Sequence, residues 1–483
     1  MRPWPWLVLL VGCTEPSVQV DPVQLSNSVL SWVLLVTAES DEATATAVCV
    51  AEDDATDRHV IPSPGVGAEL DLWLAGVRGG VTYACTVDVT QGNRTTAVDI
   101  DVDIPELPTN FPVFETEGSV PNTDWLVLNR WNQNLDSPML MVVLDDQARA
   151  RWYRELQPTK VAVDTAQAAD GRLFAGGGPD IDPTWFDALG RQSYQTPINP
   201  TAGGYHHHAE PLTDGTVLTL TLPDNVDPDS PDSDPWEGFN IVWMQPDGTP
   251  IWIWESQDAV DKGQLEVPVG GIQDPYHANS VSLVDDALGP AAWVSLHFDQ
   301  SLIRIDRDTG DITHRLGSGG DFTLVDAEGK PITGATWFSG THDPEWEWPL
   351  VTLYDNGWSG RESRIVQYRL DLEAGTAEEV WSWTDGWFEP LFGDVDRTSD
   401  GRWMITRGAC QAGCPGFNLP PGRFSEMVTV DPTTGEADWT VRASKETDGI
   451  YRAERVDPCR LFHLDGLCDG ADIGPPAAQG GTL

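Results

Sequence analysis

The sequence predicts an all-β protein, and three observations lead to this fold class. Runs of alternating apolar and polar residues, such as ATATAVCVAED at 43–53, recur along the chain and are typical of half-buried strands. Asp-Gly and related turns separate many of these runs and favour hairpins, because glycine adopts positive φ without steric cost. The third observation is that long helical patterns are hard to find anywhere in the chain.

The first part of the chain, residues 14–104, is rich in Val and Thr and alternates with period two. This pattern predicts a small antiparallel β-sandwich of the immunoglobulin-like kind. Cys49 and Cys85 both lie in it, and we expect them to join its two sheets. Residues 105–115 contain several prolines and are predicted to be a linker.

Residues 116–468 repeat one pattern, an apolar strand, an acidic or glycine turn, and a second strand that often carries Trp. A second hairpin stands between successive copies, the last being CRLFHLDG at 459–466. Two hairpins per unit form a four-stranded sheet, so the repeats predict a six-bladed β-propeller. Seven blades remain an alternative if 110–145 forms a blade of its own. The six turns fall near residues 146, 188, 247, 309, 374 and 434.

The chain is strongly acidic, with 76 Asp and Glu against 28 Lys and Arg and a formal net charge of -48. Such a surface repels nucleic acid and anionic membrane surfaces, which we therefore exclude as partners. The N-terminal segment, residues 1–13, has the form of a lipoprotein signal that ends at a lipidated Cys13. We expect an exported periplasmic or cell-surface protein, anchored by lipid alone. The Gly/Pro/Ala-rich tail, 469–483, is predicted to be disordered.

Six cysteines remain after Cys13, an even number in an oxidising compartment. The simplest interpretation is three local disulfides, with a metal site as the alternative for the last four cysteines. The predicted pairs are Cys49–Cys85, Cys410–Cys414 and Cys459–Cys468.

Three of the nine histidines stand at matching places, each just upstream of a predicted strand: His207, His277 and His342. In a propeller one such place in each blade lies beside the central axis, so three consecutive blades would bring three imidazoles together. The other blades carry VAVDT, GDVDR and RAERV there. Clustered imidazoles serve either metal binding or nucleophilic catalysis with hydrogen-bond donors for developing anionic oxygens.

A set of segments in this region resembles the bacterial arylsulfate sulfotransferases, well over 200–385 and more loosely over the whole propeller. The resemblance implies transfer of a sulfo group from a phenolic sulfate ester to a phenol through a covalent histidine, without a nucleotide sulfate donor, cofactor or metal. It implies His342 as the nucleophile, with His207, His277 and Asn279 holding the sulfo oxygens. The segments are YHHHAEPLTDGTVL, DPYHANSVSLVDD, SLIRID, THDPEWEW and LYDNGWSGRESRIVQYRLD.

The sequence departs from the family at two places. His297 stands where the family has an arginine for the sulfo group, and a run of three histidines replaces HHD, so which of His206–His208 faces the axis stays open. We expect His208, Arg364 and Trp337 to contribute to substrate binding, and Asp343 or another axial carboxylate to fix the tautomer of the nucleophile.

Two rival functions remain open. One is a non-catalytic propeller that binds a partner or polysaccharide, and the other is a metal- or quinone-dependent oxidoreductase, for which the acidic segment 224–238 offers carboxylates. The partners that we expect for the first hypothesis are a small phenolic sulfate donor and a phenol acceptor. A homodimer is left open.

Overall fold

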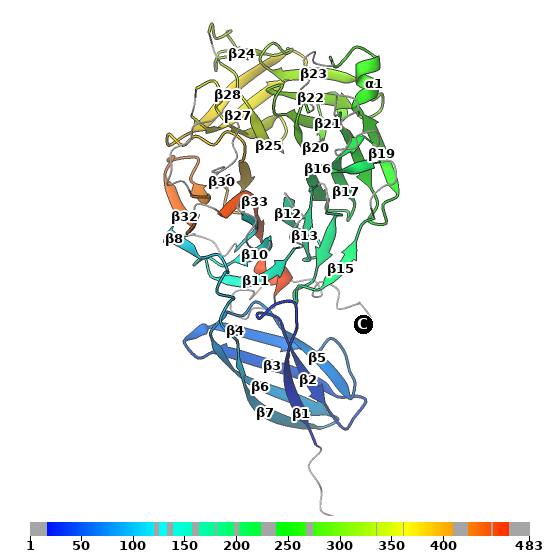
Figure 1. The fold of residues 1–483 in the computed structure, drawn as a ribbon, viewed down its shortest axis with the longest axis vertical. Helices are drawn as coiled ribbons and strands as arrows, with labels where there is room; N and C mark the ends of the chain where they lie inside the picture. Colours follow the sequence, from blue (N-terminus) through cyan, green and yellow to red (C-terminus); the bar gives the residue numbers. More distant parts are fainter. Residues whose placement is uncertain are drawn as a thin grey trace, which may run out of the picture.

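A computed structural model of the chain supplies the structure. It describes residues 17–119, 125–132, 139–156, 164–178, 181–197, 202–223, 238–266, 274–334, 336–360, 362–408, 424–445 and 448–462. The fold is all-β with several separate sheets, as the sequence predicts, and Figure 1 shows a smaller two-sheet body beside a larger ring-like arrangement of sheets. Among the described residues, no helix is long and apolar enough to cross a membrane.

The smaller body consists of a three-stranded and a four-stranded antiparallel sheet. Alternating side chains of both sheets, such as Leu34, Leu72 and Val87, are buried in one apolar core. The three-stranded sheet has the order β1 (Gln19–Gln24), β2 (Trp32–Thr37), β5 (Glu69–Leu74). The four-stranded sheet has the order β4 (Asp54–Pro62), β3 (Thr44–Ala51), β6 (Thr82–Gln91), β7 (Arg94–Asp103).

The predicted disulfide between Cys49 and Cys85 is present. Its expected role was wrong, however, because the two cysteines are directly opposite each other on neighbouring strands β3 and β6 of one sheet and do not join two sheets. Cys459 is also disulfide-bonded, and its partner lies outside the described residues. Cys13, Cys410, Cys414 and Cys468 lie outside the described residues as well.

The larger part, from residue 114 to residue 456, contains six further sheets. The first has the order β11 (Ala150–Glu155), β10 (Leu140–Leu144), β9 (Trp125–Asn132), β33 (Asp448–Val456). The second has β12 (Asp164–Gln167), β13 (Leu173–Gly176), β14 (Thr184–Phe186), β15 (Gln192–Gln195), and the third has β16 (Ala202–Pro211), β17 (Val217–Pro223), β18 (Asn240–Met244), β19 (Pro250–Glu255).

The fourth sheet has the order β20 (Ala278–Asp286), β21 (Gly289–Leu296), β22 (Ser301–Asp306), β23 (Ile312–Gly317). The fifth has β24 (Thr323–Val325), β28 (Thr376–Trp383), β27 (Arg364–Asp371), β26 (Leu350–Asp355), β25 (Thr341–Glu347). The sixth has β29 (Asp394–Arg397), β30 (Trp403–Arg407), β31 (Glu426–Val430), β32 (Ala437–Ala443), β8 (Phe114–Gly118). Two short helices are α1 (Ser256–Asp261) and α2 (Pro458–Leu461).

All six predicted turns join antiparallel neighbours, as in β10–β11 and β31–β32. Two expectations fail. CRLFHLDG does not begin as a hairpin, because Pro458–Leu461 is helical. The segment 110–145 adds no seventh sheet, since β8 pairs with β32 and β9 pairs with both β10 and β33.

One strand at the edge of each of these six sheets contacts its counterparts in the two neighbouring sheets. We call these the inner strands: β33, β12, β16, β20, β25 and β29. The described end of VAVDT, Asp164 and Thr165, lies on β12, the last four residues of GDVDR lie on β29, and RAERV lies on β33, so three places matched by sequence pattern do reach inner strands. In Figure 1 the inner strands surround a common axis.

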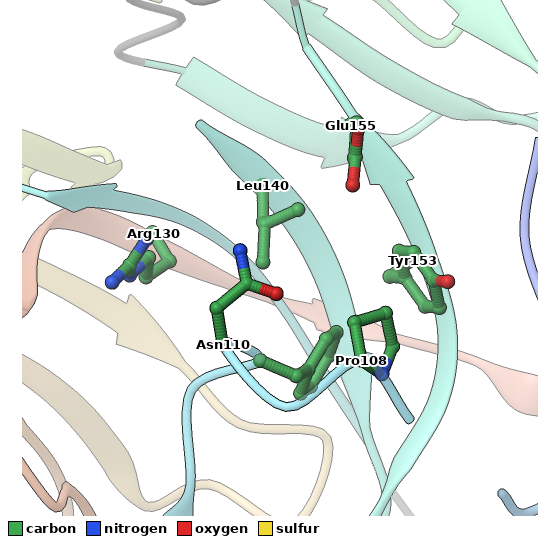
Figure 2. A pocket seen from close by; sticks show the side chains of 7 residues that line it. Pro108, Asn110, Arg130, Leu140, Tyr153 and Glu155 are labelled. Carbon is green, nitrogen blue, oxygen red and sulfur yellow. The ribbon is translucent and has the colours of Figure 1, made fainter. Parts of the chain in front are cut away.

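A buried ion-pair network joins the smaller body to the first of the six sheets. Arg151 on β11 donates to Asp57 on β4, at 2.9 Å, and to Asp145, at 2.8 Å. Nearby, Figure 2 shows a small pocket between the linker and this sheet, with Pro108 and Tyr153 on its wall. The Arg151–Asp57 ion pair therefore ties the smaller body to the first of the six sheets.

Candidate active site

Five histidines meet around the axis in a continuous set of ring contacts, which we call the imidazole cluster. The ring centroids of His206 and His207 are 4.3 Å apart, and those of His207 and His277 are 4.5 Å apart. His297 then lies 5.8 Å from His277 and 4.6 Å from His342. The structure thus brings together the three histidines singled out by their spacing, with His206 and His297 completing the set.

The backbone is unusual where these side chains leave the inner strands. His207, His277 and Asp343 have φ values of 57°, 49° and 43°, in the left-handed region that non-glycine residues rarely adopt. The pairing register also shifts at these places, for example between His342 and Glu345. Strained residues of this kind persist only where the surroundings enforce them, and they gather at functional sites. Sequence pattern alone could not reveal these bulges.

Asn356, which follows β26, fixes the tautomer of His342. The Asn356 amide nitrogen donates to the carbonyl oxygens of Glu389 and Phe392, at 2.7 and 2.8 Å, so the amide oxygen faces the imidazole. It accepts from His342 Nδ1 at 2.8 Å, which leaves the lone pair on Nε2. The expectation that Asp343 orients this imidazole was therefore wrong. Burial, together with the neighbouring His297, lowers the pKa of His342 well below its ordinary value and keeps it neutral.

The remaining imidazoles offer buried nitrogens with unused hydrogen-bonding capacity. His297 Nδ1 donates to the carbonyl oxygen of Thr341 at 3.2 Å, and burial lowers the pKa of His297 to about 3. Its Nε2 and the Nδ1 of His207 find no hydrogen-bond partner among the described residues. Buried polar atoms normally have partners, so these two nitrogens indicate a ligand. Gly340, with φ 70°, permits this packing, because a Cβ there would stand 3.2 Å from both His297 and Trp358.

His277 and Asn279 stand on either side of the start of β20 and are held differently. The Asp274 side chain accepts from both the backbone and Nδ1 of His277. Burial alone would raise the pKa of Asp274, but the bond and charge of His277 outweigh it and lower that pKa. The Asn279 amide donates to the carbonyl of Thr341 at 2.7 Å, so one of its donors is already used.

Two residues of β33, Tyr451 and Arg452, complete the site and were missed by sequence reasoning. The Tyr451 ring lies 5.7 Å from that of His342 and 6.0 Å from that of His207. Arg452 is buried and donates to Asp164 at 2.6 Å, with Asp343 at 3.3 Å. The sequence signal for Arg452 was the segment RAERV, which stands at a place matched to the histidines. No functional role was predicted for that segment.

Aromatic side chains border the imidazole cluster. Phe298 stacks on His277 with centroids 4.7 Å apart and is 39% exposed. Trp358 packs edge-on against His297 at 4.5 Å and lies 5.6 Å from Phe298. A half-open aromatic surface next to neutral imidazoles suits a flat aromatic ligand that carries a polar group.

The structure places two expected substrate residues elsewhere. Arg364 donates to Asp355 at 2.9 Å and to Glu379 at 3.1 Å, so its charge is committed within the fifth sheet. Trp337 packs against Tyr368, with centroids 5.6 Å apart, in the core between the fourth and fifth sheets. The third expected residue, His208, lies beside Arg452, with His208 Nδ1 3.3 Å from Arg452 Nη1. Burial lowers the pKa of His208 to about 3.

Three neighbouring inner strands, β25, β29 and β33, carry acidic residues that we call the carboxylate cluster: Asp343, Glu345, Asp394, Asp396 and Glu454. Burial, with the charge of Asp343, raises the pKa of Asp394 well above its ordinary value and that of Glu454 to about 8. Two sets of side chains have the spacing of metal ligands, namely His206, His207 and His277, and Asp343, Asp394 and Asp396.

Comparisons with curated proteins and with solved structures say little about the function of this chain. No curated protein matches the chain. Among solved structures, RS223 β-xylosidase matches with a TM-score of 0.28 at 9% identity, over 70% of this chain and 98% of that one. A GH43_1 enzyme from Xanthomonas citri matches with a TM-score of 0.26 at 8% identity, over 68% of this chain and 89% of that one. Scores this low carry no argument about function.

The family comparison is more informative. The model described as Arylsulfotransferase (ASST) matches residues 114–452. This span covers well over half of the chain, begins at β8, and ends at Arg452 beside the imidazole cluster. The chain therefore belongs to the arylsulfotransferase (ASST) family.

Proposed function

We propose that the protein transfers a sulfo group from a phenolic sulfate ester to a phenol, with His342 as the covalent nucleophile and without a nucleotide sulfate donor. Membership of the family supports aryl sulfotransferase activity in general and small phenols and sulfate esters as substrates. The observation that carries the finer proposal is the fixed tautomer of His342, held by Asn356 with Nε2 unprotonated.

In the first half-reaction, His342 Nε2 forms a bond to sulfur while the sulfur–oxygen bond to the donor phenol breaks. The phenolate leaves and takes up a proton from solvent or a neighbouring donor. In the second half-reaction, the acceptor hydroxyl forms a new sulfur–oxygen bond, the nitrogen–sulfur bond breaks, and the hydroxyl proton departs. A neutral imidazole suits this role, because a protonated one has no lone pair for attack.

Sulfo transfer requires positioning and stabilisation of three equatorial oxygens, as phosphoryl transfer does. The unused Nδ1 of His207 supports its role as a donor to these oxygens. The unused Nε2 of His297 carries a lone pair, because Nδ1 holds the proton, so it suits acceptance of a hydrogen bond from a phenol hydroxyl. Phe298 and Trp358 offer aromatic surface for the phenol ring. A donor role for His277 requires protons on both ring nitrogens, because Asp274 already accepts from Nδ1.

We further propose that the six sheets close into a six-bladed propeller behind an immunoglobulin-like domain. The linker expected at 105–115 is shorter than predicted, because β8 begins at Phe114 and pairs with β32 of the sixth sheet. Several bonds between inner strands support closure: Ala209 on β16 donates to Asp164 on β12 at 2.6 Å, and Ala453 on β33 donates to Asp394 on β29 at 3.1 Å. We also propose export as a lipoprotein anchored at Cys13.

The experiment uses 4-nitrophenyl sulfate as donor. Without acceptor, the full chain should release one burst of nitrophenol, and rapid peptide mapping should find one sulfo group on His342. With phenol added, turnover should continue. His342→Ala should abolish both the burst and the label, because no other group forms the intermediate.

Matched variants separate this role from a structural one. His207→Ala and His277→Ala should each lose about 10²–10³-fold in rate, the usual effect of removing one donor to a developing oxyanion. His314→Ala, on the outer strand β23, should keep the wild-type rate. Wild-type turnover by His342→Ala would contradict the proposal.

A further inference from the structure

The carboxylate cluster brings acidic side chains from neighbouring sheets to one point on the axis. One oxygen each of Asp343, Asp394 and Asp396 lies within 4.8 Å of the others. Asp343 belongs to β25 of the fifth sheet, whereas Asp394 and Asp396 belong to β29 of the sixth. The carboxyl groups of Asp343 and Asp394 also contact each other directly.

The hydrogen bonds of this trio leave buried oxygens unsatisfied. Asp394 and Asp396 are 0% and 7% exposed. Asp394 Oδ2 accepts from the backbone of Ala453, but Asp394 Oδ1 and Asp396 Oδ2 receive no backbone N–H and no basic or hydroxyl donor among the described residues. The groups that adjoin them are other carboxyls, Asp343 beside Asp394 and Glu454 beside Asp396, and buried carboxyls in contact must share a proton or a cation. Buried acceptors of this kind normally have a donor, a water or an ion. These two oxygens therefore point to a bound species independently of the clustering.

The charge balance indicates a cation. Arg452 faces the trio from one side but is shared between Asp164, at 2.6 Å, and Asp343, at 3.3 Å. One guanidinium thus serves two carboxylates and supplies no bond to Asp396. Buried carboxylates that share one guanidinium lack full charge compensation, so an additional positive charge between β25 and β29 would stabilise the folded chain.

We propose that Asp343, Asp394 and Asp396 bind a divalent cation of the calcium class, which ties β25 to β29. Ca²⁺ prefers carboxylate oxygens at about 2.3–2.6 Å, so oxygens on opposite sides of the ion are about 4.6–5.2 Å apart. Mg²⁺ requires metal–oxygen distances of about 2.0–2.1 Å and near-ideal octahedral geometry. Metals that prefer imidazole ligands would favour the imidazole cluster.

The ion would also hold the backbone of Asp343, whose φ of 43° places the preceding residue, His342, at the imidazole cluster. This last consequence rests on the proposed function, but the binding site itself does not. Cation binding and catalysis can therefore be tested separately.

The experiment measures Ca²⁺ binding on the full chain after EDTA treatment and gel filtration. Isothermal titration with CaCl2 should show uptake, and calorimetry should show a Tm higher by several degrees with Ca²⁺ than with EDTA. The double variant Asp394→Asn, Asp396→Asn should lose that Tm difference. Asp286→Asn, which alters a buried carboxylate held by Arg304 outside the trio, should retain it.

Single variants keep the test decisive if the double variant does not fold. Asp394→Asn and Asp396→Asn should each weaken Ca²⁺ affinity at least about tenfold. Absence of Ca²⁺ uptake by the wild-type chain, with an unchanged Tm, would overturn the proposal and indicate carboxyl groups neutralised by protons. Equal Ca²⁺ binding by wild type and variants would also overturn it, since the ion would then bind elsewhere, for example at 224–238.

Discussion

The imidazole cluster and the carboxylate cluster meet on β25, where His342 and Asp343 are consecutive residues, yet they differ in backbone, charge and partners. The other imidazoles lie on or next to β16, β20 and β21, whereas the other carboxylates lie on β25, β29 and β33. The imidazoles leave the strands at bulges with left-handed residues. The carboxylates follow after the bulges or, on β29, lie on a strand paired without a register shift.

This difference bears on how an acidic chain with a net charge of -48 would accept an anion under the proposed function. Burial lowers the pKa values of His206, His207, His297 and His342, so binding of a sulfate ester there would rest on hydrogen bonds and not on long-range charge. Arg452 stands between the clusters and compensates Asp164 and Asp343. We therefore expect substitutions in the imidazole cluster to change the reaction rate, and substitutions in the carboxylate cluster to change the stability of the fold.

The largest effect should come from Asn356. Asn356→Leu removes the acceptor that holds the His342 proton on Nδ1, so the wrong tautomer becomes accessible, and we expect a loss of about 10³-fold in kcat. Asn356→Asp keeps an acceptor and should lose less, with the pH profile of the donor step shifted because the new charge raises the pKa of His342. Equal rates for both variants at every pH would reduce Asn356 to a packing role.

The next effect concerns stability at alkaline pH. Burial raises the pKa of Glu454 to about 8, above its unfolded value of about 4.3. The contribution of the protonated Glu454 to the free energy of unfolding is therefore fully present below pH 4 and is lost as the pH rises through 8. In EDTA, the free energy of unfolding should fall by up to about 1.4 kcal/mol per pH unit from this group between pH 6 and 8. Glu454→Gln should flatten that fall in urea titrations; an unchanged slope would contradict the assignment.

A smaller effect is expected at Phe298. Removing its ring in Phe298→Ala takes away aromatic surface beside His277 and should raise the KM for the donor about 3–10-fold with little change in kcat. Leu288→Ala, at an exposed apolar residue in the β20–β21 turn, is the matched control and should change neither constant. A fall in kcat alone would show that Phe298 positions His277 and does not bind the phenol.

The smallest effect should be the response of the donor step to acid. The pKa of His342 lies well below its ordinary value, so the single-turnover rate of nitrophenol release should change less than about threefold between pH 8 and 5.5. An ordinary imidazole with a pKa near 6.5 would lose about tenfold over this range. Stopped-flow measurement of the burst distinguishes the two, and a tenfold loss would place a solvated imidazole at the reaction centre.

Sequence pattern predicted what depends on local periodicity and failed where distant segments meet. The hairpin turns were found because strands alternate and Asp-Gly turns are distinctive, and His207, His277 and His342 were found because their offsets repeat. The role of Asn356 was missed, since it depends on carbonyls at 389 and 392 that orient its amide. The cross-strand Cys49–Cys85 pair was misjudged because spacing alone does not distinguish one sheet from two.

The pairing of β33 with β9 has a consequence for how the protein is made. β33 is the last described strand in the chain, but it pairs with a strand that begins at Trp125 and supplies Tyr451 and Arg452 to the site. A ribosome must therefore release residue 456 before the first sheet gains its inner edge. Until then the nascent chain carries all five clustered histidines without Tyr451 and Arg452, so the site is complete only after the last described strand has been made.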